Sequence, residues 1–205
     1  MLKKIAIFGG AFNPIHKAHI EIAKIASISH QAVWIMPCFS HVHGKNMAPA
    51  MDRLAMCRLG ITSACTQFHS PVYVSSYEID NELSGGTYET LLQLKKDFSA
   101  EFSVIIGQDN ADTINTWRNW EKLINEFSFF VVPRLPFSPL VNAWYQKDPH
   151  IYENNCFVKY VPTYSSTQAR EEIRQYRKTL VPPTHLIQDV IDYIIDKNLY
   201  AEEEK

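Results

Sequence analysis

Two glycines and two histidines near the N-terminus have the types and the spacing that suit phosphate chemistry. Gly9 and Gly10 follow an apolar run, and His16 and His19 lie where a helical pattern begins. Adjacent glycines let backbone N–H groups approach an anion closely, and a helix N-terminus favours negative charge. Histidines three residues apart share one face of a helix. The segment therefore predicts a cradle for a phosphate whose charge grows during a reaction.

A tight turn followed by two surface histidines is the simpler interpretation. The position after a first strand favours the phosphate site, because ligands of open α/β sheets bind at the carboxyl ends of strands. The segment GGAFNPIHKAH resembles the G-x-F-[DN]-P-x-H-x-G-H signature of the nucleotidylyltransferase superfamily. It departs from the usual pattern at Asn13, where many members have Asp, and at Ala18, where Gly is usual. The resemblance assigns ATP binding to Gly9, Gly10 and Phe12, and catalysis to His16 and His19.

The segment YSSTQAREEIR, residues 164–174, is the second chemical cluster. A serine at 165 or 166 is suited to cap a helix, and a capping motif alone would account for it. Arg170 lies one turn inside, close enough to meet an anion at the helix N-terminus. The segment resembles the superfamily's second signature, [IV]-S-S-T-x-[IL]-R, with Tyr164 and Ala169 at the two apolar positions. The resemblance assigns ATP binding to Ser165, Ser166 and Thr167, and a catalytic grip on the phosphates to Arg170.

A third cluster begins with Gly107-Gln-Asp109 and continues to Trp117 and Trp120. A carboxylate after a strand suits ribose hydroxyls, and an indole can stack on a cationic pyridinium ring. Packing in the core is the alternative for both tryptophans, and for Trp120 it is the expectation. The block resembles the pyridine-nucleotide adenylyltransferases, which implies that Gly107 and Asp109 bind ATP and that Trp117 stacks on the mononucleotide.

Three weaker signals extend this resemblance. Lys45 lies in a polar loop, where lysines are usually solvated, but the loop resembles one in the nicotinamide mononucleotide branch whose lysine reaches the phosphates. This implies a catalytic role for Lys45. Thr87 and Tyr88 resemble a helix start beside the pyridine, and Arg134 follows the fifth predicted strand. These three residues are expected to bind the mononucleotide.

Composition excludes several classes of partner. The chain has 205 residues and a formal net charge of −2, so it has no overall attraction for nucleic acid or anionic membranes. The four cysteines lack metal-ligand spacing and are typical of reduced thiols in a cytoplasmic protein. No cluster of protein ligands for a metal is evident, so we expect Mg²⁺ to arrive with ATP. The sequence leaves open whether the chain forms a homo-oligomer.

Strand and helix patterns alternate along the chain, which predicts an α/β fold in one domain, residues 1–205, with a frayed tail from about 198. We expect a doubly wound parallel sheet, the Rossmann-like nucleotidylyltransferase fold. The composition of residues 136–154 predicts a variable loop. The strands are predicted at 5–8, 32–36, 72–74, 102–106, 129–132 and 157–161, and the main helices at 17–29, 50–66, 87–98, 164–178 and 183–196.

Together these resemblances imply an adenylyltransferase that joins ATP to nicotinate or nicotinamide mononucleotide, giving the dinucleotide and pyrophosphate of NAD biosynthesis. The sequence does not decide between the acid and the amide. Two alternative functions remain open. The protein could be a nucleotidylyltransferase for a different phosphorylated acceptor, or a catalytically idle nucleotide-binding protein.

Overall fold

The computed structural model describes residues 3–40, 44, 46–83, 86–132, 144, 152–153 and 164–201. Within them, six strands form one sheet in which every neighbouring pair is parallel. The spatial order is β3 (Val72–Val74), β2 (Ala32–Pro37), β1 (Lys3–Gly10), β4 (Ala100–Gly107), β5 (Ser128–Val132) and β6 (Tyr152–Glu153). The order reverses between β1 and β4. This confirms the predicted doubly wound fold, and the reversal marks its topological switch point.

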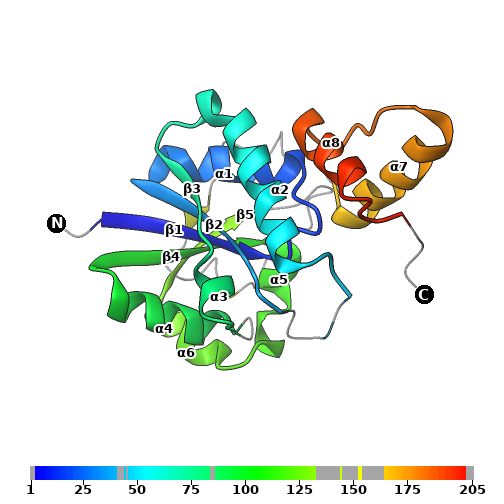
Figure 1. Cartoon of the computed structure of the whole chain (residues 1–205). Helices are drawn as coiled ribbons and strands as arrows, with labels where there is room; N and C mark the ends of the chain where they lie inside the picture. The colour runs from blue at the N-terminus through cyan, green and yellow to red at the C-terminus, as the bar shows by residue number, and fades with distance from the viewer. Residues whose placement is uncertain are drawn as a thin grey trace.

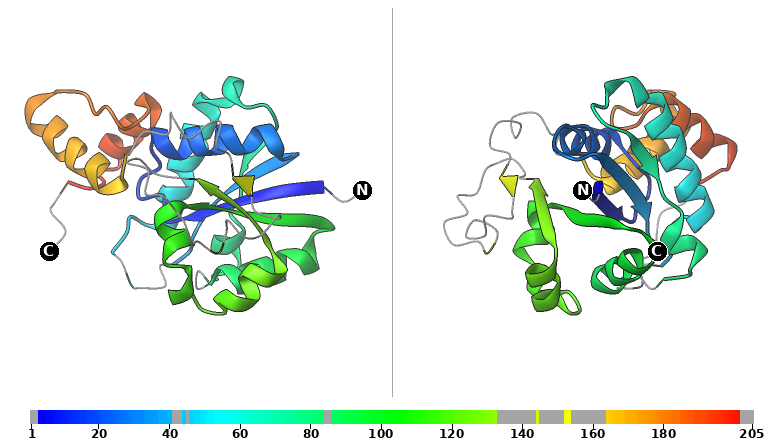
Figure 2. Two further views of the ribbon diagram at one scale, coloured as in Figure 1. Left: turned by 180° about the vertical axis from the view of Figure 1, so that it is seen from behind. Right: turned by 90° about the vertical axis from the view of Figure 1, so that its left-hand side faces the viewer.

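Helices cover both faces of the sheet (Figures 1 and 2). One layer contains α1 (Lys17–Ser29), α2 (Ala50–Ser63), α7 (Ser166–Thr179) and α8 (Gln188–Asp196), and in Figure 1 α7 and α8 extend beyond the carboxyl ends of the strands. The other layer contains α3 (Tyr77–Asp80), α4 (Thr87–Asp97), α5 (Gln108–Asp112) and α6 (Trp120–Glu126). Two 3₁₀ turns, at Cys65–Gln67 and Ile114–Thr116, complete the described elements.

The apolar side chains of β1 pack against the helix layers on both faces of the sheet. Ala6 and Phe8 pack into the cluster under α1 and α2, whereas Ile5 and Ile7 pack into the cluster under α4 and α6. Successive side chains of a strand point to opposite faces, so a strand covered on both sides must be apolar throughout. The strand continues through both glycines to Gly10, further than the apolar run indicated.

Two sequence expectations about the C-terminal region are wrong. The last helix begins at Gln188, not near 183, because the N–H groups of Thr184 and His185 donate to the Glu172 carboxylate instead of entering a helix. The frayed tail does not begin at 198 either. Leu199 and Tyr200 are half-buried against the core, and the residues beyond 201 lie outside the described part of the chain.

The strand predicted at 157–161 lies outside the described residues, so it stays a prediction. The last described strand, β6, falls instead within the predicted variable loop at 136–154. The short helix α3 was not predicted, since four residues are too few for a helical pattern to be recognised.

Candidate active site

The glycine turns follow the carboxyl ends of β1 and β4, which are neighbours in the sheet. The last pair between these strands is Ile7 with Val104, and Gly10 and Gly107 each lie three residues beyond it. A Cβ built on Gly9 meets no atom within 4 Å, which leaves open space above the end of β1. At Gly107 a Cβ would lie 2.8 Å from Asp109 Oδ1. Glycine at 107 therefore lets the Asp109 carboxylate fold back over the end of β4.

His16 and His19 form the predicted pair. Their rings are stacked, with centroids 3.6 Å apart and planes inclined by 20°. His16 is buried and caps α1, and its backbone N–H donates to His19 Nδ1 at 3.2 Å. Because Nδ1 of His19 accepts this bond, the neutral ring carries its proton on Nε2. His19 is therefore arranged as an N–H donor of the kind that a phosphate oxygen accepts.

Phe12 lies beneath His19. Its ring is buried, and it makes edge contacts with His19 at a centroid distance of 4.9 Å and with Phe8 at 5.4 Å. Its φ of 44° lies in the left-handed region, which bulky residues rarely adopt. The aromatic side chain thus supports the His19 ring from the core, and only the backbone of this turn is available to a nucleotide.

The second signature contacts the first directly. Ser166 Oγ donates to the carbonyl of Pro14 at 3.0 Å, and Arg170 Nη1 donates to the carbonyl of Asn13 at 2.9 Å. Ser165 caps α7, since its Oγ accepts the N–H of Gln168. The N-terminal ends of α1 and α7 therefore meet at one turn, although the two segments are about 150 residues apart in sequence. Two positive helix ends at one point favour a polyanion such as a triphosphate.

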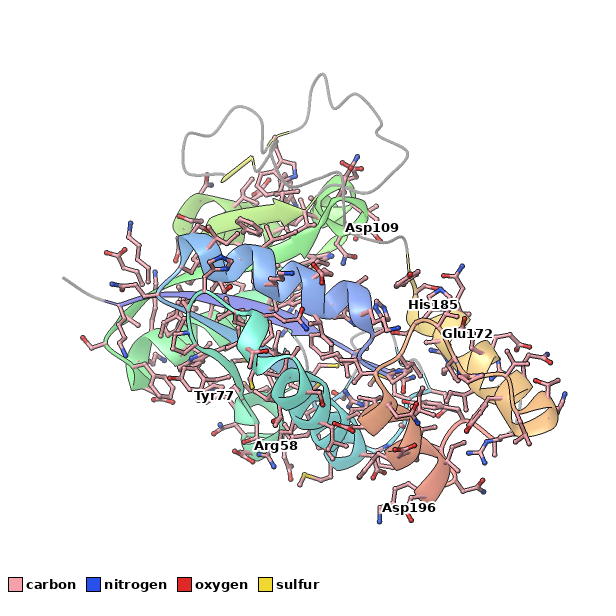
Figure 3. The ribbon with its side chains drawn as sticks, turned by 90° about the horizontal axis from the view of Figure 1, so that it is seen from above. Arg58, Tyr77, Asp109, Glu172, His185 and Asp196 are labelled. Carbon is pink, nitrogen blue, oxygen red and sulfur yellow. The ribbon has the colours of Figure 1, made fainter. Side chains whose placement is uncertain are left out.

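Hydrogen bonds to Glu172 and His185 fix these two helix ends relative to each other. The Glu172 carboxylate accepts His185 Nδ1 at 2.6 Å and the hydroxyl of Thr184 at 2.7 Å, and the carbonyl of His185 accepts the N–H of Lys17 at the start of α1. Partial burial opposes ionisation of Glu172, but these hydrogen bonds prevail and lower its pKa. Figure 3 shows Glu172 and His185 at the same end of the molecule as Asp109.

Three of the residues predicted for the mononucleotide, Thr87, Tyr88 and Trp117, lie at the start of α4 or on the segment joined to it. Thr87 is the first residue of α4 and is half-buried. Tyr88 is turned into the core, where its hydroxyl donates to Glu126 at 2.8 Å. Trp117 is half-buried against the same cluster. The carboxylate of Glu89 accepts Arg118 Nε at 2.9 Å and thereby ties α4 to the segment that carries Trp117.

Sequence reasoning missed Arg53, which is 1 % exposed and organises the walls of the site. Its guanidinium donates to four backbone carbonyls on three segments: Ala11 after β1, Cys38 and Phe39 after β2, and Ala48 before α2. The sequence did contain a signal that Arg53 is buried. Its position lies on the same stripe of α2 as the buried residues Met56, Cys57 and Gly60.

Glu78 is a second buried charge that the sequence did not indicate. It is 6 % exposed, and its Oε1 accepts the hydroxyl of Thr90 on α4 at 3.1 Å. Burial raises the pKa of Glu78 to about 7, although the Thr90 hydroxyl and the Arg53 charge act in the opposite direction. The carboxyl thus titrates near neutral pH inside the wall between α3 and α4.

Lys45 and Arg134 lie outside the described residues, so their assigned roles stay predictions. Cys38, Cys57 and Cys65 are free thiols. Over the described residues, we find no group of three or more His, Cys, Asp or Glu side chains that could hold a metal ion. Nor does any helix in that part of the chain combine the length and the apolar character that crossing a membrane requires.

Comparison with known proteins identifies the family. The model of the cytidylyltransferase-like family matches residues 7–172. A protein of Anaeromyxobacter dehalogenans, named a probable nicotinate-nucleotide adenylyltransferase, is 31 % identical over 97 % of both chains. One of Methylacidiphilum infernorum with the same name is 30 % identical over 96 % of this chain and 92 % of its own.

Similar solved structures indicate the same family. The nicotinic acid mononucleotide adenylyltransferase of Plasmodium falciparum, complexed with NaAD, superposes with a TM-score of 0.80 at 25 % identity over 97 % of both chains. The same enzyme complexed with APC gives the same values. The matched segment of the family model contains the first signature and Arg170. The chain therefore belongs to the cytidylyltransferase-like family and, within it, to the nicotinate-nucleotide adenylyltransferases.

Proposed function

We propose that the protein transfers the adenylyl group of ATP to nicotinate mononucleotide, or to nicotinamide mononucleotide, and releases pyrophosphate. The observation that carries this proposal is the meeting of the α1 and α7 N-termini beside the stacked His16–His19 pair. This arrangement suits a triphosphate, and the Plasmodium falciparum relative was solved with NaAD. The reaction supplies the dinucleotide of NAD biosynthesis.

The chemistry requires little of the protein beyond alignment and charge neutralisation. A phosphate oxygen of the mononucleotide attacks the α-phosphorus of ATP in line, and the bond to pyrophosphate breaks on the opposite side. The attacking oxygen is already anionic, so no general base is needed. Positioning and neutralisation of the developing charge then account for the rate. We assign the N–H of His19 Nε2, with His16 behind it, to the phosphate oxygens.

We propose the remaining roles from the resemblance of the sequence to the family. Arg170 clamps the leaving phosphates, with Lys45 as a proposed second cation, and the turn of Gly9 and Gly10 with the 165–167 helix start supplies N–H donors. A divalent ion, Mg²⁺ in our proposal, enters on the triphosphate and neutralises its charge. Asp109 holds the adenosine ribose. We propose that the backbone of Phe12 and Gly107 also contact ATP.

We assign the pyridine ring to the region between Thr87 and Trp117, with Arg134 as a proposed contact. Tyr88 acts there by fixing α4 through Glu126 rather than by touching the ligand. The acid is the favoured substrate, because the relatives that match are named for the nicotinate reaction. We also propose that the chain forms a single domain and that the protein is cytoplasmic.

A substrate panel tests this proposal. Purified protein is given ATP and Mg²⁺ with nicotinate mononucleotide, nicotinamide mononucleotide, phosphopantetheine or glycerol 3-phosphate, and initial rates of pyrophosphate release are compared. We expect release with the pyridine mononucleotides and fastest release with the acid. Release only with another acceptor would replace the substrate assignment, and no release with any acceptor would favour an idle binding protein.

A further inference from the structure

The turn that follows α8 lies against the first signature. Asn198 and Tyr200 have φ values of 50° and 58°, so the backbone reverses direction after the helix. Arg177 of α7 holds this turn, since its Nη2 donates to the carbonyl of Leu199 at 3.1 Å. The turn is therefore fixed by the same helix that presents Arg170 to the site.

Tyr200 reaches from this turn to Asn13. Its hydroxyl donates to Asn13 Oδ1 at 2.7 Å, and the same oxygen accepts the N–H of Ala48 at 3.0 Å. The backbone carbonyl of Asn13 accepts Arg170 at 2.9 Å. One asparagine thus joins the turn after β1 to three segments: the end of the loop before α2, helix α7 and the C-terminal turn.

The Tyr200 hydroxyl is in the protonation state that its hydrogen bond to Asn13 requires. Burial raises the pKa of Tyr200, so the group stays neutral and keeps its proton at physiological pH. A neutral hydroxyl must donate to the amide oxygen, which fixes the direction of the bond. An Asp at position 13, as in many relatives of this signature, would also offer an oxygen to both donors.

We infer that Tyr200 is a positioning residue for adenylyl transfer: by holding Asn13 it aligns the turn after β1 with Arg170 and with the loop before α2. The inference rests on the proposed function. It goes beyond the two signatures, because it makes the C-terminal turn a part of the catalytic wall. Alignment matters here because displacement of reacting groups by about 1 Å lowers rates by as much as about 10²-fold.

Tyr200→Phe and Tyr193→Phe provide the matched comparison. Each change removes one tyrosine hydroxyl from the same region of the fold, but the Tyr193 hydroxyl donates to Asp52 on α2 at 2.8 Å and not to the signature. We expect Tyr200→Phe to lower kcat about tenfold, with KM for ATP and mononucleotide within about threefold. Tyr193→Phe should keep kcat within about twofold, at a comparable melting temperature. Equal kcat in the two variants would overturn the inference.

A double-mutant cycle tests the route through Asn13. Tyr200→Phe should lower kcat as strongly in an Asn13→Asp background as in the wild type, and should have little effect in an Asn13→Ala background. The same fold-loss in all three backgrounds would show that Tyr200 acts elsewhere and would overturn the inference. Failure of the proposed function is distinguishable: the wild type itself would then transfer no adenylyl group to either pyridine mononucleotide, and both proposals would fall.

Discussion

Arg170 has two tasks at the residue scale, because it holds the Asn13 carbonyl and is positioned to clamp a phosphate. A lysine has a single ammonium group and cannot copy a planar fork with several donors. We expect Arg170→Lys to raise KM for ATP roughly 10- to 100-fold, as expected for loss of a charge-assisted hydrogen bond, with KM for the mononucleotide nearly unchanged. Steady-state kinetics measures both constants.

Arg174→Lys is the control for this prediction, since Arg174 lies one turn further along α7 and pairs with Glu171 on the same helix. It should leave both KM values unchanged. An equal rise in both KM values for Arg170→Lys would point to a displaced α7 and remove Arg170 from the ATP site.

Trp117 carries the substrate assignment. An indole face attracts a pyridinium ring by stacking and by cation–π interaction, so Trp117→Ala should weaken mononucleotide binding roughly 5- to 30-fold and spare ATP. Trp117→Phe should recover part of the loss. Because Trp117 also packs against the core, each titration needs a thermal melt of the same variant. A stable Trp117→Ala variant that binds mononucleotide normally would contradict the assignment.

Glu78 predicts a pH dependence of stability. Its pKa is about 7 in the folded protein and 4.5 in the unfolded chain, so between these values only the folded state keeps the proton. The contribution of Glu78 to stability is therefore largest below pH 4.5 and falls as the pH rises to about 7. Relative to Glu78→Gln, the wild type should lose about 3 kcal/mol of unfolding free energy between pH 4.5 and 7.5. Denaturant titrations at both pH values measure this, and a constant difference would refute it.

At the scale of elements, the site depends on one side chain that joins three loops. Arg53→Met would leave four part-buried carbonyls without their donor, so we expect a loss of more than about 3 kcal/mol of unfolding free energy. Arg58→Met, on the exposed side of α2 (Figure 3), should stay within about 0.5 kcal/mol of the wild type. Urea unfolding compares them, and equal losses would mean that Arg53 does not organise the walls.

Element positions were largely predictable because their patterns are local. Apolar runs located β1, β2, β4 and β5, and the Ser165 cap located the start of α7. The contact between α7 and the turn after β1 was not predictable from spacing, since Arg170 and Asn13 are joined only by the folded chain. The start of α8 was misplaced for the same reason, because Glu172 takes the N–H groups that would have extended that helix.

At the scale of the whole molecule, the two family signatures lie in contact, with Ser166 on the Pro14 carbonyl and Arg170 on the Asn13 carbonyl. The motif assigns Tyr88 to the mononucleotide, which stays a prediction; in the folded chain its ring is buried and its hydroxyl donates to Glu126. Arg53 and Tyr200 contact the site only through a backbone carbonyl or a neighbouring side chain, and neither residue belongs to the two signatures.

The central claim is that this end of the sheet transfers an adenylyl group and that His19 stabilises the charge that develops. The measurement is kcat for dinucleotide formation from ATP and nicotinate mononucleotide, in the wild type and in His19→Asn and His19→Ala. Asparagine at 19 can still accept the His16 N–H, but both variants lack the Nε2 donor. We predict turnover by the wild type and a kcat about 10²- to 10³-fold lower in both folded variants. Wild-type kcat in either variant, or no dinucleotide from the wild type, would contradict the account.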